Sequence, residues 1–231
     1  MTQAEIDFEK ISKALKTKAS DPWTWLFYGD SITHGAAHTH GFRAFPEIFA
    51  ERIRWELRRL YDAVINTAIS GQTTVQLLDE TRYEWRVRRF KPDVVFLLIG
   101  MNDIVKLKDI DKFRANLVEL IRRVRNDGAI PVLQNYGAVL PVPENANYML
   151  RYEKLPEYNA VIRQTALDES TIFIDHEEYW KLHASDEATL KCWLGEPIHP
   201  GAKGHLEMAK LIFQSFNIFS EDSACCTPES L

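Results

Sequence analysis

The sequence predicts an α/β protein, a three-layer α/β/α sandwich around a five-stranded parallel sheet with a flavodoxin-like strand order. Short apolar runs, typical of strands buried on both faces, alternate along the chain with amphipathic segments of helical period. Turn-forming Gly, Asp and Ser residues follow these runs. Such alternation is typical of βαβ units, which build parallel sheets covered by helices.

Five apolar runs predict the strands. The clearest is VVFLLI, which follows Pro92-Asp93 and stops at Gly100. The run WTWLFY stops in the same way at Gly29. The predicted strands cover residues 23–28, 63–68, 94–99, 129–133 and 171–174.

Apolar residues that recur at helical spacing predict helices over residues 1–20, 42–60, 113–124 and 200–216. Residues 135–152 contain prolines and show no periodicity, so we expect a long loop there. It follows the fourth strand and therefore lies at the carboxyl edge of the sheet, where open α/β proteins bind ligands. We interpret it as an active-site loop.

Composition bounds the class of protein. The chain has 231 residues, of which 45% are hydrophobic and 26% charged, so one globular domain is expected rather than a disordered or fibrous protein. We divide it into an N-terminal helical extension (1–20), an α/β domain (21–219) and a flexible C-terminal tail (220–231). A net charge of −5 gives no general attraction to nucleic acid or anionic membranes, so neither is expected as a partner.

The predicted location is cytoplasmic. The charged N-terminus has no apolar stretch typical of a signal peptide, and no run of apolar residues is long enough to span a bilayer. The three cysteines, Cys192, Cys225 and Cys226, are too few and too poorly spaced for a disulfide framework. A reduced intracellular protein fits this pattern.

Four polar segments lie at strand ends or in loops: GDSITHG at 29–35, SGQTT at 70–74, GMND at 100–103 and EPIHP at 196–200. Each alone is an ordinary turn sequence. Together they place Ser, Gly, Asn and His in chain order along one edge of the sheet. The sequence has no G-x-S-x-G, Walker A or G-x-G-x-x-G motif, which disfavours ordinary α/β-hydrolases and nucleotide-binding proteins.

With these four blocks in order, the sequence resembles the SGNH, or GDSL-type, serine esterases from about Trp25 to Phe216. The resemblance implies that residues 21–219 are a hydrolase domain. It also implies Ser31 as the nucleophile and His199 as the general base. The implied oxyanion hole comprises the backbone N–H groups of Ser31 and Gly71 and the side-chain amide of Asn102. A serine hydroxyl needs such a base, and N–H donors stabilise an oxyanion without a charge.

One position departs from the family pattern. The family usually has Asp three residues before the histidine, where this sequence has Glu196. A carboxylate one methylene longer can still orient an imidazole, so we predict that Glu196 is the third member of the triad. In the alternative, Glu196 is solvated and a backbone carbonyl orients His199. Asp186 is a second candidate for the acid.

Other residues near the blocks are candidates for substrate binding: Asp30, His38, His40, Arg43 and Tyr136. His34, His38 and His40 also suggest a metal, but the carboxylate or cysteine spacing of a metal site is missing, so neither metal nor cofactor is expected.

Two further features of the sequence have ordinary structural explanations. His205 is expected to be structural. The basic residues around Trp85, namely Arg82, Arg86, Arg88 and Arg89, indicate a solvated helix face, with an anionic-substrate or partner surface as the alternative.

The resemblance implies hydrolysis of acyl esters without a cofactor. We predict a small acylated substrate with a short acyl chain, an O-acetyl group on carbohydrate, because the expected loop is only moderately apolar. A lysophospholipase or thioesterase is the first alternative. The second is a module that binds acylated glycans without turnover, which would result if Glu196 misplaces His199.

Overall fold

The computed structural model describes residues 1–17 and 21–227. Its centre is a parallel sheet of five strands in the order β2-β1-β3-β4-β5, which confirms the predicted flavodoxin-like fold. Every strand begins within one residue of its predicted start. The strands are β1 (Thr24–Gly29), β2 (Ala63–Asn66), β3 (Val94–Leu98), β4 (Ile130–Gln134) and β5 (Ile172–Ile174).

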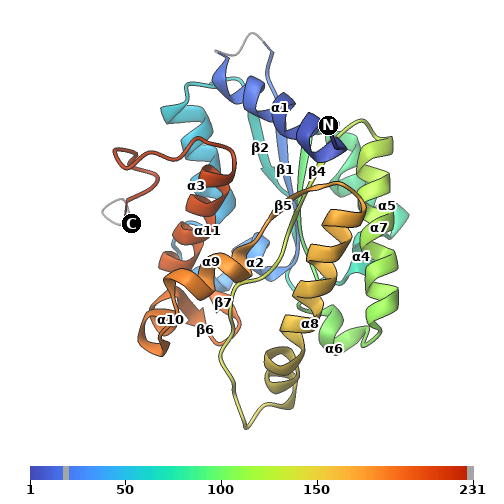
Figure 1. The fold of residues 1–231 in the computed structure, drawn as a ribbon, viewed down its shortest axis with the longest axis vertical. Coiled ribbons are helices and arrows are strands. Elements are labelled where there is room, and N and C mark those ends of the chain that lie inside the picture. The colour runs from blue at the N-terminus through green and yellow to red at the C-terminus, as the bar shows by residue number, and fades with distance from the viewer. Residues whose placement is uncertain (18–20, 228–231) are drawn as a thin grey trace.

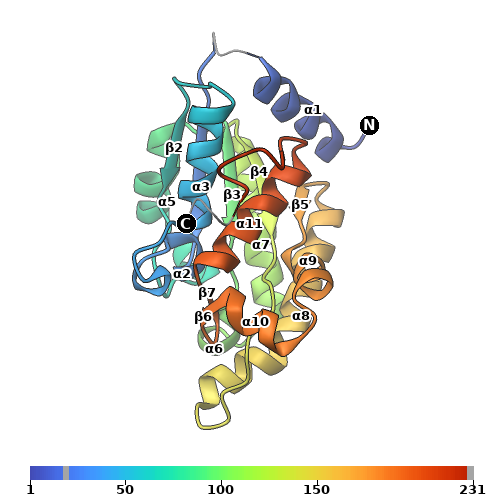
Figure 2. The ribbon, with the colours of Figure 1, turned by 90° about the vertical axis from the view of Figure 1, so that its left-hand side faces the viewer.

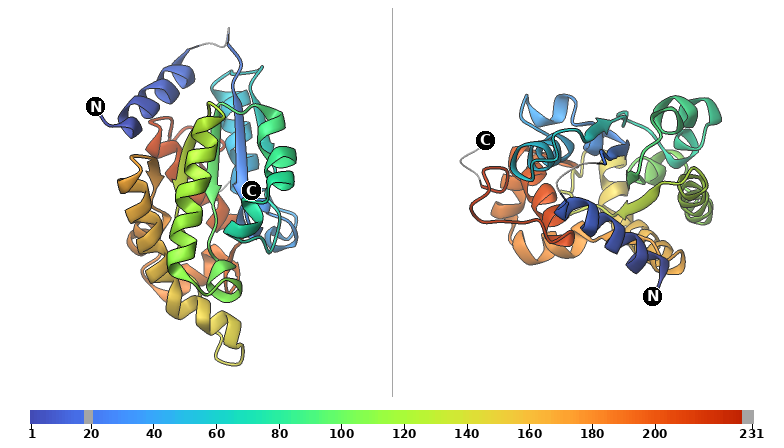
Figure 3. Two further views of the ribbon diagram at one scale, coloured as in Figure 1. Left: turned by 90° about the vertical axis from the view of Figure 1, so that its right-hand side faces the viewer. Right: turned by 90° about the horizontal axis from the view of Figure 1, so that it is seen from above.

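Helices cover both faces of the sheet (Figure 1). The layer seen face-on in Figure 2 contains α3 (Phe45–Glu51), α9 (His176–His183) and α11 (Ala202–Ser215). The opposite layer, in front in the left view of Figure 3, contains α4 (Thr74–Leu77), α5 (Glu80–Arg86), α7 (Ile110–Asn126) and α8 (Ala146–Asp168). The parallel sheet is therefore buried on both sides, as its apolar strands require.

The two ends of the sheet differ. Helix α1 (Gln3–Lys16) lies at the end where the strands begin and packs against β5 (Figure 1). The opposite end carries α2 (Ser31–His34) and α6 (Asp103–Lys106), which follow β1 and β3, and the short hairpin of β6 (Leu194–Glu196) and β7 (His199–Pro200). The remaining elements are η1 (Ala37–Thr39), η2 (Arg52–Glu56), η3 (Arg88–Phe90) and α10 (Glu187–Trp193).

Aromatic packing fixes the two central strands beneath α3. Phe27 of β1 stacks on Phe96 of β3 with ring centroids 4.4 Å apart. Phe49 of α3 meets both rings edge-on, at 5.4 Å from each. Such aromatic pairs add to the stabilisation from buried area, so the strand ends that carry the site rest on a rigid core.

The predicted bounds of one helix and one loop were wrong. The helix expected over 42–60 ends as an α-helix at Glu51 and continues only as the π-helical turn η2. Beyond it, the buried Arg59 bonds to the carboxylate of Asp62 and the carbonyl of Asp21, and these contacts replace helical ones. The loop expected over 135–152 ends at Asn145, whose side chain caps α8 by accepting from the backbone of Tyr148.

The C-terminal segment also differs from its prediction. We expected a frayed tail from Ser220, but Ser223, Cys225 and Cys226 are buried. Ser223 and Cys225 bond to the side chain of Glu56 in η2. Residues 228–231 of the predicted tail and residues 18–20 of the predicted extension lie outside the described residues, and the domain boundaries stay predictions.

Candidate active site

The polar segments after β1, β2 and β3 and the β6–β7 hairpin meet at the carboxyl end of the sheet. Ser31 opens α2 directly after β1, and the side chain of Asp30 caps this short helix by accepting from the backbone of Ile32 at 3.0 Å. A Cβ on Gly29 would lie 2.3 Å from the carbonyl oxygen of Leu98, so only glycine lets the chain leave β1 this close to β3.

Ser31, His199 and Glu196 form a hydrogen-bonded chain. The Ser31 Oγ lies 2.9 Å from His199 Nε2, and His199 Nδ1 lies 3.0 Å from Glu196 Oε2. Glu196 and His199 are opposite each other in the antiparallel β6–β7 pair, which gives the longer carboxylate its reach. Since a carboxylate only accepts, Nδ1 carries the ring proton and Nε2 is left to accept from the serine hydroxyl.

The electrostatics of this chain keep the imidazole neutral. Burial lowers the pKa of His199 to about 4, and the charge of His38 adds to the effect, while Glu196 opposes it. Burial acts to raise the pKa of Glu196, but its hydrogen bond from His199 and the charges of both histidines hold it below its usual value. At neutral pH the pair is therefore a carboxylate beside a neutral imidazole, which is the state a general base needs.

Asn102 and Gly71 lie in the neighbouring turns. Asn102 Nδ2 donates to the backbone oxygen of Gln72 at 3.0 Å. Gly71 has a φ of +80°, in the left-handed region that favours glycine. Asp103, whose pKa burial raises to about 6, accepts from the backbone N–H and hydroxyl of Thr74 and so joins the two turns.

Arg151 is a site residue that the sequence analysis missed. Its Nη2 donates to Asn102 Oδ1 at 3.3 Å and its Nε to the carbonyl oxygen of Met101 at 3.2 Å. The side chain is buried, and burial lowers its pKa. It lies on the second turn of α8, in a segment expected to be loop, so helical spacing did not reveal it.

Asp30 and Tyr136 are brought together, but below the surface. The Tyr136 hydroxyl donates to Asp30 Oδ2 at 2.6 Å and accepts from the backbone of Met101 at 3.2 Å. Both residues are at most 2% exposed, and burial raises the pKa of Asp30 to about 7. This buried pair supports the segments that carry Ser31 and Asn102, and Tyr136 also lines a cavity beside Ile32 and Met101. The substrate-binding role of both residues stays a prediction.

The other predicted substrate-binding residues have different surroundings. His38 contacts Glu196 and His199, and its ring lies parallel to that of His199 with centroids 3.4 Å apart. His40 is exposed, and Arg43 pairs with Glu51 of α3. The ring of His38 thus contacts both Glu196 and His199.

Within residues 1–17 and 21–227, the group that could offer three metal ligands comprises His38, Glu196 and His199, with ligand atoms within 4.8 Å of one another. Both rings, however, present Nδ1 to the same Glu196 oxygen, at 3.2 Å from His38 and 3.0 Å from His199. Each Nδ1 must therefore carry a proton rather than an open lone pair. The arrangement fits a shared hydrogen bond better than a metal centre.

A small cavity lies among chain neighbours of Ser31, Asn102 and His199, but Ser31, Glu196 and His199 themselves do not line it. It offers about 10 Å³ for the centre of a water-sized molecule, which is about the room that one water needs. Its apolar walls include chain neighbours of Ser31, Asn102 and His199 and one residue of α11, namely Ile32, Met101, Ile198 and Met208.

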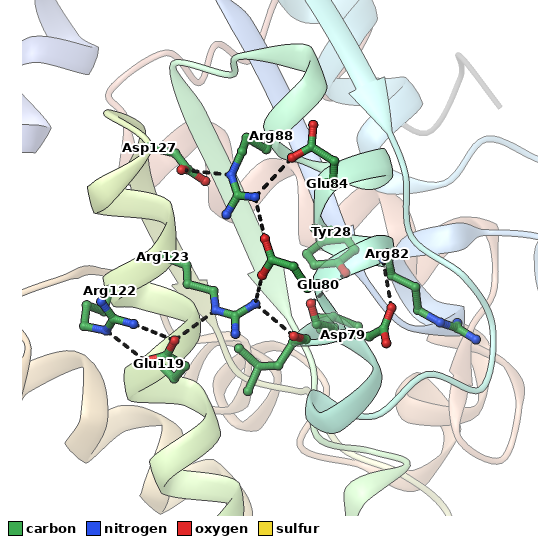
Figure 4. Close-up of polar contacts among 12 residues, drawn as sticks. Tyr28, Asp79, Glu80, Arg82, Glu84, Arg88, Glu119, Arg122, Arg123 and Asp127 are labelled. Atoms are coloured by element: carbon green, nitrogen blue, oxygen red, sulfur yellow. Dashed lines mark hydrogen bonds and ion pairs between the residues drawn. The ribbon is translucent and has the colours of Figure 1, made fainter.

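Three other features lie outside the triad. His205 is fully buried and its Nδ1 accepts from the backbone of Phe45 at 3.3 Å, as expected of a structural histidine. Asp186, the second candidate acid, is exposed and caps α10. Figure 4 shows Arg88 paired with Glu80, Glu84 and Asp127. The other arginines near Trp85, namely Arg82, Arg86 and Arg89, are exposed, as on a solvated helix face.

Comparison with known proteins agrees with this geometry. The model of the GDSL-like lipase/acylhydrolase family matches residues 27–206. The chain belongs to this family. The protein is thus a serine hydrolase of carboxylic esters, and the resemblance drawn from its four sequence blocks is confirmed.

The chain is similar in sequence to two curated proteins. It is 33% identical over 111 residues to an uncharacterized protein of Mycoplasma pneumoniae, a match that covers 46% of this chain and 12% of that protein. It is 27% identical over 207 residues to an acetylxylan esterase of Geobacillus stearothermophilus, covering 80% of this chain and 90% of the relative. The chain thus spans a small part of the first relative and most of the second.

A solved structure shares the fold of this chain. The crystal structure of the acetylxylan esterase Axe2 from Geobacillus stearothermophilus superposes with a TM-score of 0.70 at 20% identity, over 88% of this chain and 98% of that one. In the described part of this chain, no helix combines the length and apolarity needed to cross a membrane. The cytoplasmic location stays a prediction.

Proposed function

We propose that the enzyme hydrolyses short-chain acyl esters, with O-acetyl groups on carbohydrate as the substrate class. The observation that carries the reaction is the chain of contacts from Ser31 Oγ through His199 to Glu196, at 2.9 Å and 3.0 Å. Ser31 is the nucleophile, His199 the general base and Glu196 the carboxylate that orients the imidazole. This arrangement supports turnover over a module that only binds acylated glycans.

Acylation begins when Ser31 Oγ attacks the ester carbonyl and His199 Nε2 takes the hydroxyl proton. Glu196 stabilises the imidazolium that forms. The carbonyl oxygen becomes an oxyanion, which accepts from the backbone N–H groups of Ser31 and Gly71 and from Asn102 Nδ2. The intermediate then collapses, the bond to the alcohol oxygen breaks, and His199 returns the proton to that oxygen.

Deacylation repeats these steps with water. His199 Nε2 takes a proton from a water molecule whose oxygen attacks the acyl carbon of the Ser31 ester. The second tetrahedral intermediate is held by the same donors. Its collapse breaks the bond to Ser31 Oγ, which receives the proton from His199, and the free acid leaves.

Two observations support a small acyl group. The small cavity lined by chain neighbours of Ser31, Asn102 and His199 has space of only about 10 Å³ for the centre of a water-sized molecule, far less than a long acyl chain needs. The curated relative that covers most of this chain is an acetylxylan esterase. We therefore favour acetyl esters over the long-chain substrates of lysophospholipases and over acyl thioesters.

A substrate series tests this proposal. We expect kcat/KM to be highest for acetyl to butyryl p-nitrophenyl esters and to collapse for longer chains, and acetate to be released from acetylated xylo-oligosaccharides. Ser31→Ala protein is the control for spontaneous hydrolysis. Faster turnover of decanoyl or palmitoyl esters, or of acyl thioesters, would favour a lipolytic enzyme or thioesterase. Saturable binding without any turnover would favour the binding module.

A further inference from the structure

The side chain of His38 duplicates part of the environment of His199. The two rings are parallel within 4°, with centroids 3.4 Å apart. Both use Nδ1 to contact the same atom, Glu196 Oε2, at 3.2 Å from His38 and 3.0 Å from His199. Since a carboxylate oxygen has two lone pairs, Glu196 Oε2 can accept from both rings at once.

Glu196 has a particular need for a second contact. Its side chain is 37% exposed, while that of His199 is only 9% exposed. A glutamate has one more rotatable bond than an aspartate, and an exposed carboxylate is readily drawn into water. A single hydrogen bond to His199 would do little to prevent the Glu196 side chain from rotating away into water.

The backbone around His38 is fixed against the hairpin that carries Glu196. Element η1 packs on both β6 and β7. A Cβ on Gly195 would lie 3.1 Å from the carbonyl oxygen of His38 and 3.2 Å from the Cα of Gly201, so glycine permits this close contact. His38 therefore comes from a backbone segment whose position relative to Glu196 is set by packing.

We propose that His38 is a positioning residue that holds Glu196 Oε2 against His199 Nδ1. In this way it compensates for the longer acid at position 196. The proposal rests on the proposed roles of Ser31, His199 and Glu196. In this proposal His38 transfers no proton itself and acts through Glu196.

Two substitutions separate its hydrogen bond from its ring. His38→Asn keeps an N–H donor attached to the same γ position but removes the ring, and His38→Phe keeps a ring and removes the donor. With p-nitrophenyl acetate, we expect His38→Phe to lower kcat by roughly 10-fold or more with KM within about twofold, because misplaced catalytic groups lose rate. We expect His38→Asn to retain kcat within about threefold of wild type.

A matched control uses His183, an exposed histidine at the end of α9. His183→Asn should leave kcat and KM unchanged. Thermal unfolding of all variants shows whether the fold is retained. A His38→Phe protein with wild-type kcat overturns the proposal, and so does an equal loss in the Phe and Asn variants.

A double-mutant cycle tests whether His38 acts through Glu196. In the Glu196→Gln background, His38→Phe should change kcat by less than about twofold, because the group that it positions has been removed. An undiminished effect in that background would show that His38 acts on the substrate or on His199 alone, and would contradict the proposal. If wild-type protein shows no Ser31-dependent hydrolysis, the proposed function itself fails, which is a separate outcome.

Discussion

Arg151 of α8 donates from Nη2 to Asn102 Oδ1 at 3.3 Å, so a buried guanidinium fixes the amide predicted to serve the oxyanion. The side-chain amide of an asparagine can rotate by 180°, so that its oxygen and its nitrogen swap positions. The guanidinium of Arg151 can only donate hydrogen bonds. Its contact therefore selects the orientation in which Asn102 Oδ1 points toward α8. Asn102 Nδ2 is thereby left to donate elsewhere, and one of its contacts is the Gln72 carbonyl.

Replacing Arg151 should therefore impair catalysis more than binding. We expect Arg151→Met to lower kcat for p-nitrophenyl acetate by roughly 10–100-fold with little change in KM, because a misaligned donor stabilises the transition state poorly. Lys154→Met, an exposed position of the same helix, is the control and should match wild type. If Arg151→Met raises KM alone, the guanidinium binds substrate directly.

Removing the amide itself gives a stronger effect. Asn102→Ala should lower kcat by roughly 10²–10³ and leave KM nearly unchanged, since the donor serves mainly the transition state. Steady-state kinetics on acetyl esters measure both constants. Adding Arg151→Met to this variant should cost little more, because the arginine acts through the amide that is gone. A rise in KM with kcat intact would place Asn102 in ground-state binding.

The preference of the enzyme for acyl chain length should depend on the volume of the small cavity near Ile32, Met101 and Ile198. Met208 of α11 is buried and lines it. Met208→Ala should widen the cavity and raise the ratio of hexanoyl to acetyl kcat/KM by roughly 10-fold, with a stability loss of about 2–5 kcal/mol measured by denaturant unfolding. Met208→Leu nearly conserves volume and should leave the ratio unchanged. An unchanged ratio in the alanine variant would mean that the acyl group lies elsewhere.

The acid at position 196 should control both rate and pH dependence. Glu196→Asp shortens the side chain by about 1.5 Å, so its kcat should lie between those of wild type and Glu196→Gln. We expect Glu196→Gln to cost roughly 10–10³-fold in kcat. Wild-type rates in both variants would make Glu196 a bystander in a Ser–His dyad.

The pH profile supplies a second readout. The base works when His199 is neutral, and its pKa is lowered to about 4, so kcat/KM should fall as the pH drops through about 4. Glu196 acts to raise the pKa of His199, so Glu196→Gln should move this acid limb to lower pH. An acid limb of the kcat/KM profile near pH 6.5 in both wild type and Glu196→Gln would contradict the lowered pKa of His199.

The sequence predicted the parts of the site that are local. Ser31, Gly71 and Asn102 follow strands whose apolar runs are unmistakable, and parallel strands bring their ends to one edge. The sequence named His38 as a candidate for substrate binding but not as a partner of Glu196, and it missed Arg151, because both residues depend on long-range contacts. They contact residues 158 and 49 positions away in the chain, respectively. Nothing in either local sequence specifies those partners.

Helix α8 shows why the rest of the fold was harder to predict. Its apolar residues do not gather on one face, and Pro156, a helix breaker by itself, lies in its interior. Tertiary packing against α7 and α6 stabilises this helix despite its weak local pattern. Segment 220–227 is similar, because its polar composition conceals the contacts of Ser223 and Cys225 with Glu56.

The central claim is that Ser31, activated by His199, forms the acyl-enzyme. Its most direct test is the hydrolysis of p-nitrophenyl acetate by purified Ser31→Ala protein beside wild type, with thermal unfolding to show that the fold is kept. The account predicts a loss of at least about 10³-fold in kcat, because triad members act as a unit. Turnover near the wild-type rate by the folded Ser31→Ala protein would contradict it.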